Sequence, residues 1–298
     1  MSILASGTTD AAPLALSEAP PQSAPRLWRR LLRHNSAVAG MILLGFLVLA
    51  SLIGPLLFRS DPTAQDLSLA FLPRSAAHPL GTDDLGRDEL VRLFFGARYT
   101  LSLALAAVAL GLVVGVPLGA VSGYFGGWVD LLVQRVVDVM LAFPSILLAI
   151  SLVAALGVGL RNVIVSVAIV AMPGFIRLVR ASALSIREAP YVEAARALGV
   201  PSWRILLRHV VPNSLGPLIV QASLQLGGAI LVAAGLGFLG LGVQQPTPEW
   251  GAMLGFSHTY IFSDPGLLTY PGLCICGAVL AFNLLGDGLR DALDPRMK

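Results

Sequence analysis

Few residues of this chain have the types and spacing that catalysis needs. Ser257 and His258 are adjacent in the sequence, but neighbouring side chains seldom reach the geometry of a nucleophile and its base. The four histidines are scattered, and no H-E-x-x-H or G-x-S-x-G arrangement occurs. The only lysine is Lys298, so the chain lacks the G-x-x-x-x-G-K-[ST] loop that binds ATP phosphates. The sequence therefore indicates a protein that is not an enzyme by itself and holds no cofactor.

The two cysteines do not form a recognisable metal site. Cys274 and Cys276 have C-x-C spacing inside an apolar run, which differs from the usual zinc patterns. Two thiols so close together on a helix rarely form a disulfide. We expect both to be core residues, and we predict no bound metal ion.

The densest group of charges is the run HPLGTDDLGRDEL, which begins at His78. Its adjacent Asp83 and Asp84 could suggest a cation site, but their spacing is not that of an EF-hand loop. A simpler interpretation is a capped turn in which Thr82 or Asp83 starts a helix. The glycines within the run, at positions 81 and 86, would permit the bend.

The composition shows which kind of protein must position these residues. Of 298 residues, 56% are hydrophobic and 12% are charged, against about 25% charged in ordinary soluble domains. Such a chain cannot hide its apolar surface in one water-soluble core, so it is expected to lie in membrane lipid. Its net charge of +3 is too small an excess to suggest binding to nucleic acid.

Six charge-poor runs are candidates for membrane spans. The 22 residues of 37–58 would reach about 33 Å as a helix, enough to cross a hydrocarbon core of about 30 Å. The third run is interrupted by Pro144. The fourth run is long enough to cross the membrane only if its helix continues past Arg177 and Arg180, whose side chains can reach the headgroups. The predicted spans lie within 37–58, 99–129, 139–160, 162–176, 213–242 and 265–286. The predicted fold is an all-α integral membrane bundle of six transmembrane helices.

The distribution of basic residues predicts the orientation. Residues 1–25 should form a disordered cytoplasmic tail, 26–98 hold the first transmembrane helix and an external loop, and 99–298 hold the other five helices and a cytoplasmic loop at 187–212. This arrangement places 14 of the 20 basic residues inside and six outside, as the positive-inside rule favours. Both termini are therefore predicted to be cytoplasmic.

The predicted span interiors contain no titratable side chain, although ion-coupled transporters usually need one there. Asp130 and Asp138 stand at the edge of the third span, where a solvated helix end is a simpler interpretation than a proton relay. Gln221, Gln225 and Asn283 are polar but do not titrate. Such amides either hold helices together or bind a substrate, and the sequence leaves both roles open.

The segment 190–212, PYVEAARALGVPSWRILLRHVVP, is the most distinctive charged stretch between apolar runs. Pro190 fits the first turn of a helix, Glu193 lies near the positive end of its dipole, and Gly199 can end it in a left-handed cap. A second short helix is predicted from the apolar spacing of residues 203, 206, 207 and 210. Arg204 and Arg208 share its other face.

Both short helices need a surface to pack against, because isolated helices of about ten residues are marginal in water. One possibility is that they rest on lipid headgroups. The other is that they enter a groove on another protein, which the small residues of the first helix would favour.

The amino-acid sequence of this segment resembles that of a known family. EAARALG followed by LRHVVPN resembles the EAA loop of ATP-binding-cassette (ABC) importer permeases. HPLGTDDLGRDEL with GAR, then PEWGAML, and finally LGDGLRDALDPR resemble the C-type subunits of dipeptide, oligopeptide and nickel uptake systems. The resemblance implies a six-helix subunit of a bacterial inner membrane. It also implies a second, similar permease chain, two cytoplasmic ATPases that bind ATP and Mg²⁺, and an external solute-binding protein.

The resemblance also assigns roles to residues. It implies that the cytoplasmic loop couples to the ATPases through Tyr191, Glu193, Ala194, Ala195, Leu198, Gly199, Arg204 and Arg208. The external loops are expected to dock the solute-binding protein through Asp83, Asp84, Arg87, Asp88, Glu249 and Trp250. The resemblance identifies no residue that contacts the substrate.

The expected function is therefore ATP-driven import of di- or oligopeptides, or a related small solute, by alternating access. A nickel or metal-complex importer shares these motifs and is the alternative within the same class. Two alternatives belong to other classes. An essential intramembrane carboxylate would support an ion-coupled transporter, and loss of activity in Ser257→Ala would support a membrane hydrolase.

Overall fold

The computed structural model describes residues 31–32, 34–58 and 60–293. Within these ranges the regular secondary structure is helical, apart from an isolated β-bridge between Thr82 and Asp88. The predicted all-α fold class is confirmed. The predicted tail 1–25 and the arginines at 26, 29, 30 and 33 lie outside the described residues.

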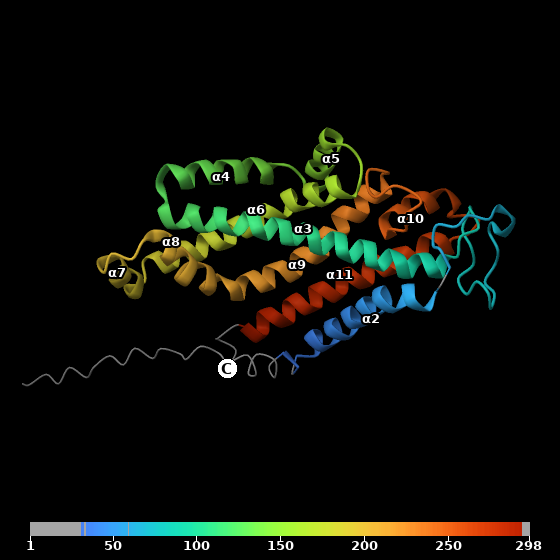
Figure 1. Ribbon diagram of the computed structural model, residues 1–298, viewed down its shortest axis with the longest axis horizontal. Helices are drawn as coiled ribbons and strands as arrows, with labels where there is room; N and C mark the ends of the chain where they lie inside the picture. The colour runs from blue at the N-terminus through green and yellow to red at the C-terminus, as the bar shows by residue number, and fades with distance from the viewer. Residues whose placement is uncertain (1–30, 33, 59, 294–298) are drawn as a thin grey trace, which may run out of the picture.

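Five of the described helices are long and apolar enough to cross a membrane. They are α2 (Asn35–Leu57), α3 (Glu89–Phe125), α6 (Leu160–Arg187), α9 (Val211–Phe238) and α11 (Gly266–Leu293). All five run roughly along the long axis of the molecule (Figure 1). One end of the bundle carries α7 (Pro190–Ala197) and α8 (Ser202–Ile205), and we call it the α7 end. The opposite end carries residues 60–88, and we call it the loop end.

The predicted third span is not one straight helix. The chain instead forms α4 (Gly127–Ala142) and α5 (Ser145–Leu156), which meet at 100° and count as one broken span at most. The break follows from Pro144, because proline pushes the residue before it out of the helical region, and Phe143 has extended angles of −92° and 138°. With this pair as one span, the described chain has up to six spans.

The broken span also begins earlier than the sequence predicts, since α4 starts at Gly127 and includes both of its aspartates. Asp130 accepts two hydrogen bonds of 2.6 Å from the Arg180 guanidinium, and Asp138 accepts one of 2.6 Å from Arg177. The two arginines therefore pair with carboxylates of α4. These pairs let the helix continue through charged positions that the sequence places at its edge.

Helix α3 also starts earlier than predicted, at Glu89, and its N-cap is Asp88 rather than Thr82 or Asp83. The Asp88 carboxylate accepts a hydrogen bond of 3.0 Å from the backbone N–H of Val91. The two glycines of the preceding turn have positive φ values of 86° and 73°, as the predicted bend requires.

The second helix of the 190–212 segment is not separate, and that prediction is wrong. Helix α8 continues through a π-helical turn, η2 (Leu206–Val210), directly into α9. The backbone N–H of Val211 donates to the carbonyl of Leu206 in this wide turn. Pro212 lacks an N–H and crowds the preceding carbonyls, and a π-turn is one of the recognised ways to relieve such crowding. One helix therefore runs from Ser202 to Phe238.

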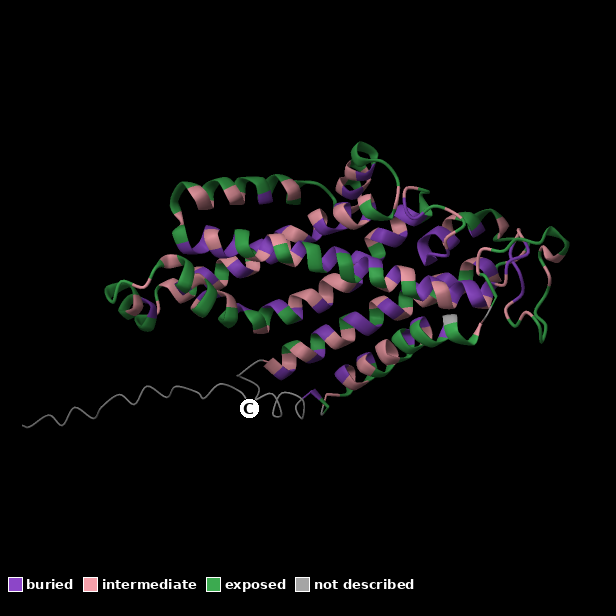
Figure 2. Ribbon diagram, viewed as in Figure 1, coloured by how far each residue is buried: buried purple, intermediate pink, exposed green. Residues whose placement is uncertain are grey.

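Helices α3 and α6 form the centre of the bundle, where buried positions concentrate in Figure 2. Four glycines of α3 face α6 at intervals of four residues, and we call them the glycine ladder. They are Gly111, Gly115, Gly119 and Gly123. A Cβ atom at Gly119 would lie 2.5 Å from the carbonyl oxygen of Ile176, so only glycine allows this approach of the two backbones. The G-x-x-x-G spacing of these residues is the sequence signal that indicates such a close helix contact.

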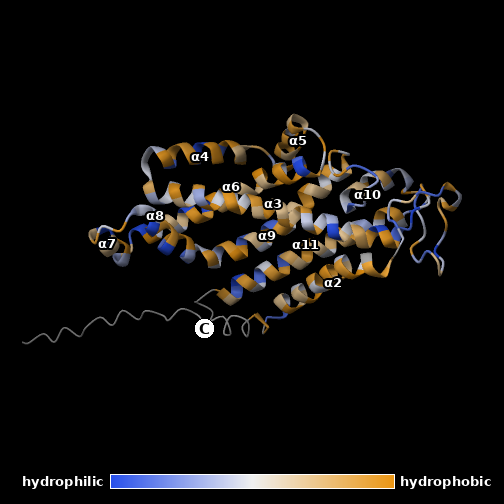
Figure 3. Cartoon of the chain, in the orientation of Figure 1, coloured by the Kyte–Doolittle hydropathy of each residue, from blue (hydrophilic) through white to orange (hydrophobic). Residues whose placement is uncertain are grey.

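Helix α2 packs against α11 and turns its other side outward. Ala37 is fully buried against Gly288, whereas Ile42 and Leu56 are 68% and 79% exposed. Figure 3 shows this helix as strongly hydrophobic along its length. An apolar face without a protein neighbour is what a lipid-facing helix presents.

Candidate functional site

Helix α7 forms as the sequence predicts. Pro190 occupies its first turn, where a missing N–H costs no hydrogen bond, and Glu193 lies in the first turn as well. Gly199 follows the end of the helix with a φ of 77°. The backbone N–H of Val200 donates to the carbonyl of Ala195 at 3.0 Å, which closes the helix in a left-handed cap.

The inner side of α7 is fixed to the membrane helices. Val192 is completely buried. The Arg196 guanidinium lies over the ring of Tyr124 at 4.9 Å, and its Nε donates to the Tyr124 hydroxyl at 3.2 Å. Tyr124 belongs to the last turn of α3, so this contact links α7 to α3.

The outer side of α7 and α8 is open, and we call it the coupling face. Seven of the eight residues predicted for ATPase coupling are exposed on it: Tyr191, Glu193, Ala194, Leu198, Gly199, Arg204 and Arg208. The eighth, Ala195, is half-buried. Leu198 is 83% exposed, so a large apolar side chain faces outward at the end of α7.

The coupling face also exposes one aromatic and one aliphatic residue that were not predicted to contact the ATPases. Trp203 and Leu207 are 58% and 64% exposed, and the Arg204 guanidinium lies 5.3 Å from the Trp203 ring. Their helical spacing predicted an apolar side shared with Leu206 and Val210, but only Val210 of that set is fully buried, together with Ile205. The coupling face thus combines apolar anchors with basic residues, as protein interfaces often do.

The loop end is organised by a buried ion pair. The Arg87 Nε donates to Asp83 at 2.6 Å, and the other oxygen of that carboxylate accepts from the backbone N–H groups of Leu85 and Arg87. Arg87 also donates to Gln245, and Arg92 donates to the carbonyl of Pro62. These contacts tie the 60–88 loop to the segment before α10 (Trp250–Ser257).

The start of α10 is equally enclosed. The Glu249 carboxylate accepts hydrogen bonds from the backbone N–H groups of Gly251 and Ala252 and from the Thr100 hydroxyl, at 2.9 to 3.0 Å. The Trp250 indole N–H donates to the carbonyl of Leu93 at 3.0 Å. Burial raises the pKa of Glu249, and these three hydrogen bonds oppose that rise.

Four of the six residues predicted to contact a docking protein are therefore not at the surface. Asp83, Arg87, Glu249 and Trp250 are each at most 5% exposed. The prediction of direct contact is wrong for them, because their polar groups are satisfied inside this chain. Asp84 and Asp88 are partly exposed, and Asp88 also contacts the His78 ring at 2.8 Å.

The described residues contain no group of three or more His, Cys, Asp or Glu side chains arranged to hold a metal ion. Both cysteines are free thiols. Cys274 is half-buried, but Cys276 is exposed on α11, so its prediction as a core residue is wrong. The Nδ1 atom of His258 contacts the carbonyl of Gly255 and is therefore not placed to act as a base for Ser257.

Comparison with known proteins identifies the family. Residues 115–298 match the family described as binding-protein-dependent transport system inner membrane component. Residues 26–73 match the N-terminal transmembrane domain of oligopeptide transport permease C. The chain belongs to the binding-protein-dependent transport permeases. It is thus a multi-pass inner-membrane component of a bacterial ABC importer, as the sequence predicts.

Individual relatives cover nearly the whole permease. It is 48% identical to the dipeptide transport system permease DppC of Alkalihalophilus pseudofirmus, with 91% of this chain and 89% of that one covered. It is 44% identical to the glutathione transport system permease GsiD of Pectobacterium atrosepticum, with 91% and 90% covered. The inward-facing methionine ABC transporter MetNI shares its fold, with a TM-score of 0.56 at 22% identity over 68% of this chain and 96% of that one.

Proposed function

We propose that this permease carries short peptides into the cell as one of two similar membrane subunits. Two ATPase subunits bind at the α7 end, and a solute-binding protein delivers the peptide at the loop end. Peptide transport is supported by the names of the relatives, which include a dipeptide and a glutathione permease. The same names favour peptides over nickel complexes.

The orientation follows from the charges at the two ends. Arg187, Arg196, Arg204 and Arg208 lie at or next to the α7 end, which supports a cytoplasmic location for it. Both termini then face the cytoplasm, since the bundle has six spans when α4 and α5 count as one.

The observation that carries the proposal is the two-sided character of α7. One side is fixed to α3 through Val192 and the Arg196–Tyr124 contact, while the coupling face on the other side exposes apolar residues. Helix α7 leaves Leu198 83% exposed, and the coupling face also exposes Trp203 and Leu207. Such a helix fits a groove on a second protein.

The geometry gives two routes from the coupling face into the bundle. The Arg196–Tyr124 contact leads to α3, and the continuous helix through α8 leads to α9. When ATP binding closes the ATPase pair, the coupling faces of the two permease subunits move together. Packed helices transmit such a displacement as a rigid-body motion, which alternates access to the substrate path.

The coupling role can be tested with substitutions on the coupling face. Glu193→Arg reverses an exposed charge, and Gly199→Trp places a large side chain at a left-handed position. We expect both variants to remain in the membrane, to lose co-purification with the ATPases, and to lower peptide uptake at least about tenfold, which corresponds to about 1.4 kcal/mol.

The matched control is Glu188→Arg, five residues before Glu193. Its side chain is 73% exposed but belongs to the end of α6 rather than to α7. We expect normal uptake and normal ATPase association for this variant. Unchanged uptake by both Glu193→Arg and Gly199→Trp would refute the coupling role.

A further inference from the structure

Two neighbouring cavities lie along helices α6 and α9. The first has a volume of about 320 Å³ and is lined by Leu178 of α6, Pro217 and Gln221 of α9, and Arg290 of α11. The second has a volume of about 230 Å³ and is lined by residues 167–174 of α6, residues 225–232 of α9, and Ser145. Both cavities are lined by α6 and α9, the first next to Leu178 and Gln221 and the second next to Gly174 and Gln225.

Gly174 of α6 lines the second cavity. A Cβ atom built there would lie 3.1 Å from the side-chain nitrogens of both Gln221 and Gln225, which occupy successive turns of α9. Gln225 also donates to the carbonyl of Ala171 at 3.2 Å. The absence of a side chain at position 174 therefore leaves room for two amides between α6 and α9.

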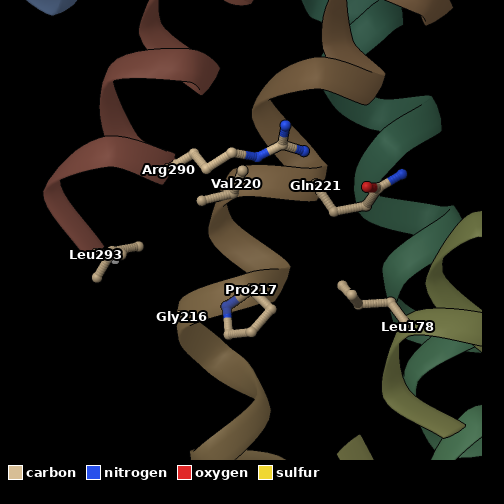
Figure 4. Close-up of a pocket in the computed structure, with 7 residues that line it drawn as sticks. All are labelled: Leu178, Gly216, Pro217, Val220, Gln221, Arg290 and Leu293. Carbon is tan, nitrogen blue, oxygen red and sulfur yellow. The ribbon is translucent and has the colours of Figure 1, made fainter. Parts of the chain in front are cut away.

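Figure 4 shows how the polar groups of the first cavity are arranged. Arg290 extends from α11 across α9 beside Val220, while Gln221 projects from α9 toward α6. The remaining lining residues of this cavity are apolar or lack a polar side chain. The first cavity thus offers one neutral amide and one positive charge, and the second cavity offers another neutral amide.

This arrangement matches the chemistry of an extended peptide. Side chains four residues apart on a helix are separated by about 6 Å along its axis. Groups on the same side of an extended chain recur every two residues, about 6.6 Å. Amides donate and accept hydrogen bonds without charge, as a peptide backbone does, and a guanidinium binds a terminal carboxylate in a bidentate pair.

We propose that Gln221 and Gln225 hydrogen-bond the backbone of the transported peptide and that Arg290 binds its C-terminal carboxylate. This inference rests on the proposed peptide import and names the substrate contacts of this subunit. Asn283, the third amide considered from the sequence, is placed differently, since its Oδ1 lies 3.1 Å from a Cβ position at Gly227 in the α9–α11 packing. It serves as the matched control.

The test uses the complete importer in proteoliposomes, with its partner permease, ATPases and solute-binding protein. The probe is a pool of isotope-labelled di- and tripeptides. We expect Gln221→Leu and Gln225→Leu to lower uptake about tenfold while the ATPase activity stimulated by the binding protein is kept. Asn283→Leu should retain normal uptake. Wild-type uptake in both glutamine variants, or loss of ATPase stimulation with uptake, would overturn the inference.

The carboxylate contact has its own readout. Arg290→Gln should lower uptake of peptides with a free C-terminal carboxylate about tenfold, and it should leave uptake of the same peptides with a C-terminal amide unchanged. An equal effect on both forms, or none on either, would overturn the assignment of Arg290.

A labelling experiment covers the case in which a leucine variant fails to assemble. In a chain with Cys274→Ala and Cys276→Ala, Gln221→Cys should react with a small methanethiosulfonate reagent, and the peptide pool with its binding protein should slow that reaction. The reaction of Asn283→Cys should not change. Equal protection at both positions, or none at position 221, would contradict the inference. If the wild-type importer moves no peptide, the proposed function itself falls.

Discussion

At the scale of single residues, the loop end shows that a charged motif need not be a surface motif. Asp83 and Arg87 look like a hydrophilic turn in the sequence, but the structure buries both in an ion pair. Through its contact with Gln245, Arg87 joins two loops that are 158 residues apart. Under the proposed function, the partly exposed surface around Asp84 and Asp88 remains accessible to the solute-binding protein.

The buried pair predicts a large effect of removing one partner. Arg87→Met removes the guanidinium that donates to Asp83 at 2.6 Å and leaves only Arg92, whose Nε lies 3.5 Å from that carboxylate. Breaking a buried ion pair costs about 3 to 5 kcal/mol. We expect a clear fall in the melting temperature of the detergent-purified protein. The loops should also become more sensitive to protease.

The control is Asp84→Asn, which affects a partly exposed carboxylate 3.9 Å from Arg87. Such a weak pair contributes at most about 1 kcal/mol. A melting temperature of Arg87→Met equal to that of Asp84→Asn would contradict the role of the ion pair.

At the scale of elements, the glycine ladder sets the distance between α3 and α6. Gly119→Ala places a methyl group against the backbone of α6, so the helices must separate, and overpacking of this kind costs about 1 to 3 kcal/mol. Gly45→Ala on α2 is the matched control, because no atom lies within 4 Å of its Cβ position.

Gly119→Ala should lower the melting temperature, and Gly45→Ala should not. The control should be neutral or stabilise the protein by about 0.5 to 1 kcal/mol, because alanine favours the helix over glycine. Thermal unfolding in detergent measures both. Equal melting temperatures for Gly119→Ala and Gly45→Ala would show that α3 and α6 are not closely constrained.

The elements that local chemistry specifies were predicted well from the sequence. The cap at Gly199, the start of α7 at Pro190 and the continuation of α6 past Arg177 all appear in the structure. Each depends on one residue type at one place in a helix.

The elements that depend on distant partners were not predicted. The charges of α4 are tolerated because Arg177 and Arg180 lie opposite them, 39 and 50 residues away in the chain. The same is true of the candidate sites. Helical spacing predicted only part of the exposed coupling face. The burial of Glu249 depends on its contact with Thr100, which is 149 residues away in the chain.

At the scale of the whole molecule, the proposed orientation can be tested directly. In a chain with Cys274→Ala and Cys276→Ala, we expect a membrane-impermeant thiol reagent to label Ala76→Cys in intact cells. Ala194→Cys should react only after the membrane is opened. Both alanines are exposed, one at the loop end and the other on the coupling face. Labelling of Ala194→Cys from outside would reverse the proposed topology.

The helix from Ser202 to Phe238 has a consequence for energy use. Its 37 residues measure about 55 Å, and it carries Trp203 near one tip and both proposed peptide-binding glutamines in its middle. Under the proposed function, ATP hydrolysis and peptide binding then both act on one continuous helix. Thermodynamic linkage between two binding sites is reciprocal, so a peptide bound to that helix also changes how readily the ATPase subunits close around ATP.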